Sequence, residues 1–131
     1  MSAPLIISVS GLRGVVGESL TDDVAQRYAA ALSAVAPPGP VVVTRDGRSH
    51  GAMIAEVVAA ALVRCGRTVL DAGVAATPTT GVLVRQLNAA GGVQISASHN
   101  PPEYNGLKLF NAAGRVIPAA EGERVLACYR E

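Results

Sequence analysis

Short apolar runs that alternate with stretches of helical length constrain the fold of this chain more than any other feature. Val41–Val43 contains only β-branched residues, and Val93–Ile95 is a second short run of the buried type. Such strands need cover on both faces, which parallel sheets obtain from helices. Two further runs of this kind are Leu5–Val9 and Thr68–Asp71. The alternation predicts an α/β fold, a three-layer α/β/α sandwich with a mostly parallel mixed sheet.

The segments between these runs carry helix start and stop signals. Thr21 followed by two aspartates is typical of a helix start, and the prolines from Pro37 onward end that helix. Gly66 is well placed to terminate the second helix, and Thr77 is expected to cap the third. The predicted helices begin near Thr21, Ser49, Thr77 and Pro118, and they end near Val35, Cys65, Ala89 and Tyr129.

A β-hairpin is predicted near the C-terminus. Asn105-Gly106 is a strong turn signal, and Leu107–Phe110 then has the character of a strand. A second turn around Gly114 leads to Val116–Ile117, which is expected to pair with that strand.

Size and charge exclude several classes of protein. The chain has 131 residues, which fits one domain spanning residues 1–131, and its net charge is +1. Without a basic run or a set of stacking aromatic residues, nucleic-acid binding is not expected. No segment has the apolar length of a membrane span, and the first residues lack a signal-peptide pattern. Cys65 and Cys128 form no zinc-type cluster, so a reducing, cytoplasmic location is expected.

Polar side chains that could take part in catalysis follow the run Val93–Ile95. Ser98 and His99 stand on a loop just past a strand end, where open α/β sheets place their chemistry. Two adjacent residues do not usually form the hydrogen bond of a Ser–His catalytic pair, so the dipeptide alone also fits an ordinary polar loop. The strand Leu107–Phe110 would bring Lys108 close to this loop.

Two earlier loops each present an arginine at a predicted strand end. Gly11 and Gly14 flank Arg13 and would hold its guanidinium at a loop tip, where it suits a phosphoryl group. A plain turn with a solvated arginine is the alternative. Thr44–Ser49 contains Arg45 and would support the cleft, with Arg45 as a candidate phosphate contact. The alternative is an Asp–Arg pair that organises the loop and caps the next helix. His50, which follows, is expected at the surface.

These strings closely resemble those of the α-D-phosphohexomutases, the family of phosphoglucomutase, phosphomannomutase and phosphoglucosamine mutase. Ser96–Pro101 with Tyr104–Lys108 resembles the active-site loop of that family, and Gly11–Gly14 resembles its G-x-R-G loop. Thr44–Ser49 and Gly73–Pro78 are also similar to family loops. The resemblance covers essentially the whole chain, but only the first of the family's four domains.

The resemblance implies an intramolecular phosphotransferase, an isomerase that acts on hexose phosphates. Phosphorylated Ser98 would give its phosphoryl group to a sugar phosphate, and the bisphosphorylated sugar would reorient and return the other group. Lys108 would handle a proton or stabilise charge, with assistance from His99. The implied catalytic residues are Ser98, His99, Lys108 and Arg13, and the implied phosphate-binding residues are Arg13, Asn100, Lys108 and Arg45.

The resemblance also implies parts that this sequence does not contain. A Mg²⁺ ion would bind Ser98 through its phosphate, but the aspartate-rich D-G-D-G-D-R loop is absent. The remaining metal ligands and domains II–IV are therefore expected as partners outside this chain, which alone should have no significant mutase turnover. The choice among glucose, mannose and glucosamine phosphates cannot be made from domain I.

Two alternatives stay open. The same loops could belong to a non-catalytic α/β module that binds phosphate or a partner chain. A serine hydrolase that uses Ser98 is the second, although the sequence has no G-x-S-x-G motif.

Overall fold

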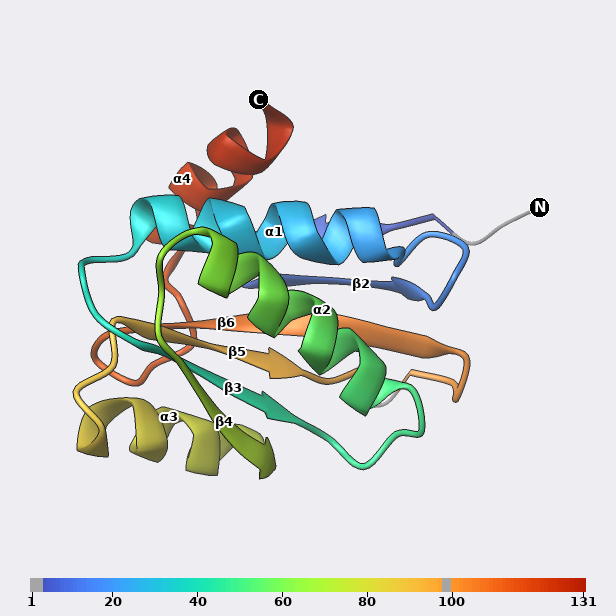
Figure 1. The fold of residues 1–131 in the computed structure, drawn as a ribbon. Coiled ribbons are helices and arrows are strands. Elements are labelled where there is room, and N and C mark those ends of the chain that lie inside the picture. The colour runs from blue at the N-terminus through green and yellow to red at the C-terminus, as the bar shows by residue number, and fades with distance from the viewer. Residues whose placement is uncertain (1–3, 98–99) are drawn as a thin grey trace.

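A computed structural model describes residues 4–97 and 100–131 and shows one mixed sheet between layers of helices (Figure 1). The strand order is β1-β2-β6-β5-β3-β4. The strands are β1 (Ile6–Ser8), β2 (Gly11–Val15), β3 (Val41–Arg45), β4 (Val69–Val74), β5 (Gly91–Ile95) and β6 (Tyr104–Asn111). The helices are α1 (Asp22–Val35), α2 (Gly51–Arg64), α3 (Thr77–Gln86) and α4 (Ala119–Arg130).

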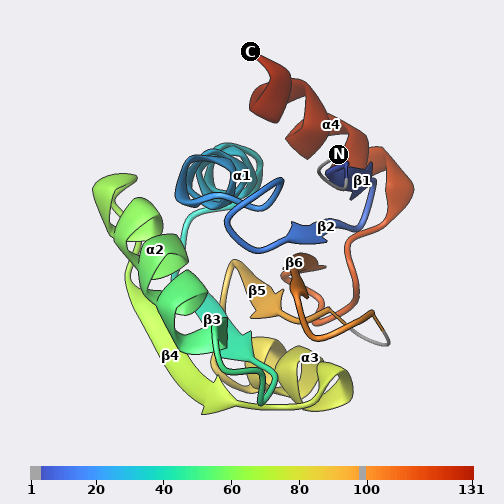
Figure 2. The same ribbon diagram turned by 90° about the vertical axis from the view of Figure 1, so that its right-hand side faces the viewer.

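The predicted three-layer α/β/α arrangement is confirmed. Helices α1, α2 and α4 lie on one side of the sheet, and α3 lies on the other (Figure 2). The larger core lies beneath the first three helices and includes Leu32, Leu62 and Leu109. A smaller core beneath α3 consists of Val42, Val84, Ala89 and Phe110. Within the described ranges, no helix has both the length and the apolar character that crossing a membrane requires.

The sheet is mixed, as predicted, but antiparallel pairings outnumber parallel ones, so the prediction that it is mostly parallel is wrong. Only β3–β4 and β3–β5 are parallel, and the other three pairings between the described strands are antiparallel. The reason is that Gly11–Val15, predicted as a loop, forms strand β2 between β1 and β6. Two glycines weaken the local strand signal of this segment, so only its neighbours in the sheet make it a strand.

The predicted C-terminal hairpin is present only as a remnant. Phe110 and Val116 form an isolated antiparallel bridge, and Ile117 N donates to Leu109 O at 2.9 Å. Pro118 follows and has no N–H to continue the ladder, so the chain leaves the sheet and begins α4. The expected turn at Asn105-Gly106 is also wrong, because both residues are buried inside β6.

The predicted N-terminal cap is present at α1 and absent at α3. Thr21 caps α1 as predicted, with its Oγ1 accepting from Val24 N at 3.3 Å. Thr77, by contrast, is the first residue of α3, and its hydroxyl donates to Gln94 Oε1 at 2.8 Å. Gln94 is buried in β5 and donates in turn to Ala75 O at 2.9 Å. Thr77 therefore ties the start of α3 to the sheet instead of capping it.

Arg67 links the end of α2 to the connection between α1 and β3. It donates to Ser33 Oγ at 3.0 Å and Ser33 O at 2.7 Å, and to Ala36 O at 2.9 Å. Two further bonds reach Pro37 O at 2.5 Å and Gly39 O at 2.9 Å. One guanidinium thus satisfies carbonyls that the end of α1 leaves without helical partners.

We expect Arg67→Ala to lower the free energy of unfolding by about 2 kcal/mol, because several charge-assisted hydrogen bonds are lost while water replaces only part of them. Urea denaturation followed by circular dichroism measures this change. Arg64→Ala removes an exposed arginine from the end of α2 and should change the free energy by less than about 0.5 kcal/mol. Equal stability of the two variants would contradict the prediction.

Candidate functional site

A pocket of about 160 Å³ opens on the sheet beside β2 and β6. Helix α3 packs over β3 and β5. It lies on the same side of the sheet as the pocket, but nearer the edge formed by β4. The lining residues come from β1, β2, β6 and the chain just after β5. They are Ile6, Ser8, Ser10, Gly11, Leu12, Arg13, Ser96, Ala97, Leu107 and Lys108.

Strand register places Arg13 and Lys108 together in this pocket. Gly11 is paired with Lys108, and Arg13 is paired with Gly106. Directly opposite residues and residues two apart share one face of a sheet, so the two cations are diagonal neighbours on the same face. Diagonal neighbours are about 7–8 Å apart at the backbone, a spacing that long side chains can close around one anion.

The glycines opposite the two cations let the strands approach closely. A Cβ atom at Gly106 would lie 2.4 Å from Leu12 O and 3.0 Å from both Arg13 Cβ and Ser96 O. A Cβ atom at Gly11 would lie 2.3 Å from Leu107 O. The floor of the pocket is therefore backbone, and the cationic side chains have room above it.

Charge in the pocket is positive and uncompensated by the described residues. Arg13 is exposed and Lys108 is half-buried. The ion pairs between described residues are Arg27–Asp23 and Arg48–Asp46, and neither includes a pocket cation. Two like charges on one face repel each other, so an anion between them would be stabilised.

Ser98 and His99 lie outside the described residues, but both ends of their segment are defined. Ala97 is buried and lines the pocket. Asn100 donates to Ala97 O from its backbone N at 3.0 Å and from its Nδ2 at 2.7 Å. The chain thus leaves β5 beside Arg13 and Lys108, and on the other side of residues 98–99 the Asn100 side chain ties it back to Ala97.

The structure does not bring Arg45 to this pocket. Arg45 is in register with Ile95, which belongs to the larger core on the α2 side of the sheet. A Cβ atom at Gly51, the first residue of α2, would lie 3.5 Å from Arg45 Cδ. Arg45 therefore lies beneath the start of α2 and is left out of the candidate site. Of the three loops that carry Arg13, Arg45 and Ser98, the described residues at this pocket come from the Arg13 strand and from the segment just after β5.

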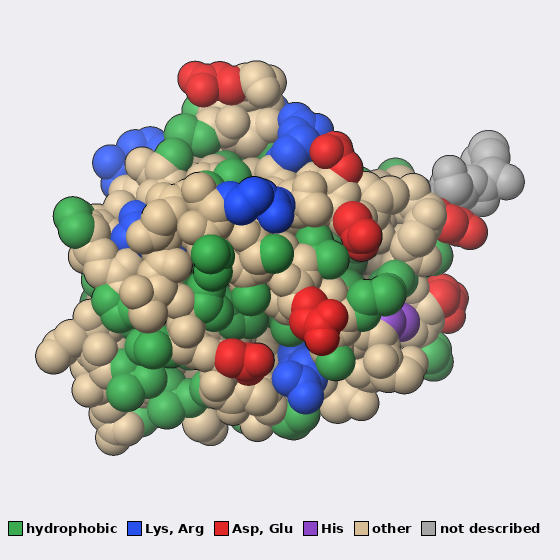
Figure 3. Space-filling model, viewed as in Figure 1, with side chains coloured by type: hydrophobic (Ala, Val, Ile, Leu, Met, Phe, Trp, Pro, Cys, Tyr) green, Lys and Arg blue, Asp and Glu red, His purple; other side chains and the backbone are tan. Residues whose placement is uncertain are grey.

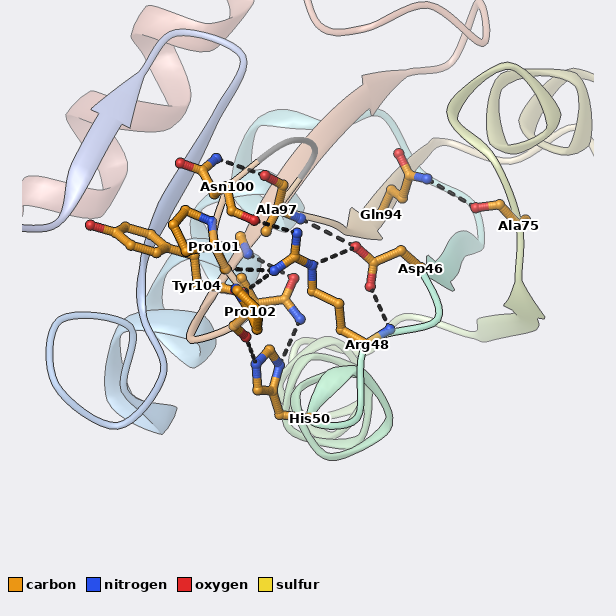
Figure 4. A network of polar contacts seen from close by, with 12 residues as sticks. Asp46, Arg48, His50, Ala75, Gln94, Ala97, Asn100, Pro101, Pro102 and Tyr104 are labelled. Atoms are coloured by element: carbon orange, nitrogen blue, oxygen red, sulfur yellow. Dashed lines mark hydrogen bonds and ion pairs between the residues drawn. The ribbon is translucent and has the colours of Figure 1, made fainter.

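A polar network that the sequence did not reveal joins the β3–α2 connection to residues 97–105 (Figure 4). Arg48 donates to Asn100 O and Pro101 O, both at 2.6 Å. Asp46 accepts from Ala97 N at 3.3 Å, and His50 contacts Pro102 O at 3.0 Å. His50 lies at the surface as expected, but it is half-buried and hydrogen-bonded. The string from Asp46 to Arg48 indicated only a local pair, because contacts across about fifty residues leave no local pattern.

Metal ligands are not gathered in the part of the chain that the structure describes. No group of three or more His, Cys, Asp or Glu residues within residues 4–97 and 100–131 could hold a metal ion. The described pocket lining contains serines, two cations and apolar side chains, but no carboxylate.

Sequence comparison identifies relatives of this chain. The profile of the family described as phosphoglucomutase/phosphomannomutase, alpha/beta/alpha domain I, matches residues 5–131. The phosphoglucosamine mutase of Synechococcus sp. (strain WH7803) is 40% identical over 129 residues, which are 98% of this chain and 28% of that protein. The probable phosphoglucosamine mutase of Pyrococcus horikoshii is 43% identical over 105 residues, 80% of this chain and 23% of that protein.

Solved structures agree with these relatives. The crystal structure of a putative phosphomannomutase from Thermus thermophilus superimposes with a TM-score of 0.89 at 34% identity, covering 98% of this chain and 30% of that one. A phosphoglucomutase/phosphomannomutase family protein from Burkholderia thailandensis gives a TM-score of 0.81 at 28% identity, covering 95% of this chain and 31% of that one. The chain thus spans less than a third of the length of these relatives.

Proposed function

This chain belongs to the phosphoglucomutase/phosphomannomutase family, whose α/β/α domain I it matches, and from that membership we propose that it is the serine-bearing domain of a phosphohexomutase. The mutase would interconvert hexose 1-phosphates and hexose 6-phosphates through a phosphoserine at Ser98. The observation that carries this proposal is the pocket in which Arg13 and Lys108 share one face beside Ser96 and Ala97. A phosphoryl group attached at the next residue, Ser98, would meet two cations that have no ion-pair partner among the described residues.

The proposed reaction moves one phosphoryl group in each half. In the first half, the bond between phosphorus and Ser98 Oγ breaks, a bond from phosphorus to a sugar hydroxyl oxygen forms, and the proton of that hydroxyl ends on Ser98 Oγ. In the second half, the bond between the other phosphoryl group and its sugar oxygen breaks, that group bonds to Ser98 Oγ, and the serine proton ends on the sugar oxygen. Phosphoryl transfer depends mainly on positioning and on balancing the charge of the oxygens. Arg13 would supply a fork of N–H donors for those oxygens.

Lys108 would act in the same half-reactions from β6. Its ammonium group can balance charge on the transferring group, whereas only its neutral amine form could accept the proton of the attacking hydroxyl. His99 remains a proposed assistant in that step, and Asn100, through its two bonds to Ala97 O, would keep the segment in shape.

The proposal includes a Mg²⁺ ion on the ground of family membership alone. Phosphoserine 98 would be one ligand, supplying negatively charged oxygens of the kind that Mg²⁺ binds. The described residues provide no further set of ligands for the ion. We propose that the other ligands, and the residues that select the hexose, belong to domains II–IV outside this chain. The names of the relatives leave phosphoglucosamine, phosphomannose and phosphoglucose as candidate substrates.

The first test asks whether Ser98 carries a phosphoryl group. Incubation with acetyl phosphate, a small donor that needs no sugar-binding domain, should add the mass of one phosphoryl group to the wild-type chain. The Ser98–phosphate bond forms as acetate leaves, and the serine proton is released. Peptide mapping should place the group on Ser98, and Ser98→Ala should gain none.

The same preparation should show no significant turnover of hexose 1-phosphate in a coupled assay, because the chain matches only domain I of the family. Robust turnover by the 131-residue chain would contradict the proposal that it is one domain of a longer mutase.

A non-catalytic binding module remains the second candidate. Exposed apolar side chains support it: Met53 and Val63 of α2 are 53% and 60% exposed. Hydrophobic side chains are visible at the surface in Figure 3. A chain that binds inorganic phosphate and self-associates, but never gains a phosphoryl group on Ser98, would favour this candidate over the mutase domain.

A further inference from the structure

Three side chains from the β3–α2 connection hold the segment on both sides of Ser98, and we propose that Asp46, Arg48 and His50 are positioning residues for phosphoryl transfer at that serine. The inference rests on the function proposed above, because it assigns these residues a part in the same reaction. They do not line the pocket, and they would act through the backbone that they hold (Figure 4).

Arg48 holds the chain that follows Ser98. Its guanidinium donates to Asn100 O and Pro101 O at 2.6 Å each, and to Tyr104 O at 3.3 Å. Its Nε lies 3.6 Å from Asp46 Oδ2, and the side chain is only 21% exposed. A planar guanidinium has five N–H donors in a rigid fork, whereas a lysine has one compact ammonium group that cannot span the same carbonyls. Arg48 is therefore not replaceable by charge alone.

Asp46 holds the chain that precedes Ser98. Its Oδ2 accepts from Ala97 N at 3.3 Å, and its Oδ1 accepts from Arg48 N at 3.1 Å. Its own backbone N donates to Ile95 O, at the end of β5, at 2.8 Å. Asp46 thus holds the strand end through its backbone N, and through its carboxylate it connects the residue before Ser98 with the arginine that holds the other side.

His50 extends the network to β6. A carbonyl oxygen only accepts, so His50 Nε2 donates to Pro102 O at 3.0 Å, and His50 Nδ1 accepts from Asn105 Nδ2 at 3.0 Å. The orientation of the Asn105 amide is set by its Oδ1, which accepts from Gly106 N at 2.9 Å. Gly106 is the residue paired with Arg13, so the network ends opposite one of the pocket cations.

The effect on transfer follows from geometry. Displacing a reacting atom by about 1 Å can slow a reaction on the order of 100-fold, even when the altered residue is remote from the chemistry. Loss of the network would free Ala97 and Asn100 together, and it would leave Arg13 and Lys108 in place on their strands.

Arg48→Lys tests the inference, with Arg67→Lys as a matched control. Both arginines donate to several backbone carbonyls, but Arg67 bonds to the α1–β3 connection and does not line the pocket. With acetyl phosphate as the donor, we expect Arg48→Lys to slow the phosphorylation of Ser98 on the order of 100-fold. Arg67→Lys should remain within about twofold of the wild type, although both variants lose stability.

Amide hydrogen exchange provides a readout that general destabilisation does not imitate. The amides of Ala97 and Asn100 should exchange roughly tenfold faster in Arg48→Lys than in Arg67→Lys, after correction for global unfolding. If Arg48→Lys does not fold, Asp46→Asn takes its place, because the backbone bond of residue 46 to Ile95 O survives that change.

Unchanged phosphorylation and unchanged exchange in Arg48→Lys would overturn the inference. Faster exchange with unchanged phosphorylation would overturn the positioning role while keeping the structural one. A wild-type chain that gains no phosphoryl group would instead refute the proposed function, and the positioning role with it, whatever the exchange rates show.

Discussion

Arg13→Ala is expected to slow the phosphorylation of Ser98 by acetyl phosphate on the order of 100-fold. Arg13 lies on β2 with its side chain on the same face as Lys108, and it has no ion-pair partner among the described residues. Its donors are therefore available to neutralise phosphoryl oxygens as charge redistributes during transfer. Time-resolved intact-mass measurement of the chain gives the rate.

Two variants control this result. Arg64→Ala makes the same change of charge on an exposed part of α2 and should leave the rate within about twofold of the wild type. Arg13→Lys keeps the charge but loses the planar fork, so it should recover only part of the rate. A rate for Arg13→Ala close to that of the wild type would remove Arg13 from the site and leave Lys108 as the remaining cation among the described lining residues.

Gly122→Ala is expected to lower the free energy of unfolding by about 3 kcal/mol, the largest effect on stability from one methyl group. Gly122 is buried in α4, and a Cβ atom there would lie 1.7 Å from Val9 O and 2.6 Å from Val9 C. Both atoms are backbone, so they cannot rotate away, and α4 would have to move from the turn between β1 and β2. That turn leads into β2, which carries Arg13.

The sign of the change makes this prediction decisive. In a helix free of tertiary contacts, replacing glycine by alanine stabilises by about 1 kcal/mol. Urea denaturation should therefore give opposite outcomes for a helix packed against Val9 and for one that is not. Glu123→Ala changes the next, exposed residue of α4 and should stay within about 0.5 kcal/mol of the wild type. Stabilisation by Gly122→Ala would show that α4 does not pack as described.

The parts of the fold that sequence predicted are those whose signals are local. Val41–Val43 is fully buried, as its uninterrupted β-branched composition indicated. Thr21 accepts the capping bond at the start of α1, and Gly66 follows α2 at φ 86°, a conformation that glycine adopts without strain. In each case the residue and the structure that it specifies are within a few positions of each other.

Predictions failed where a segment takes its structure from a distant partner. Gly11–Val15 has the composition of a loop but becomes a central strand between β1 and β6. Asn105-Gly106 has the composition of a turn, yet Asn105 is buried and bonded to His50, fifty-five positions earlier. Local propensity is weaker than the free energy of pairing and burial, so a neighbour in space overrides it.

The same distinction between local signals and distant contacts applies to the candidate site. Residue type and order are enough to indicate the chemistry available to the chain, because the run Ser96–Pro101 and the cations Arg13 and Lys108 can be read directly from them. Which of these groups lie together depends on strand register, which brings Arg13 and Lys108 to one face of the sheet and Arg45 to the other. A side chain's identity is encoded at one position, whereas its neighbours depend on how distant strands pair.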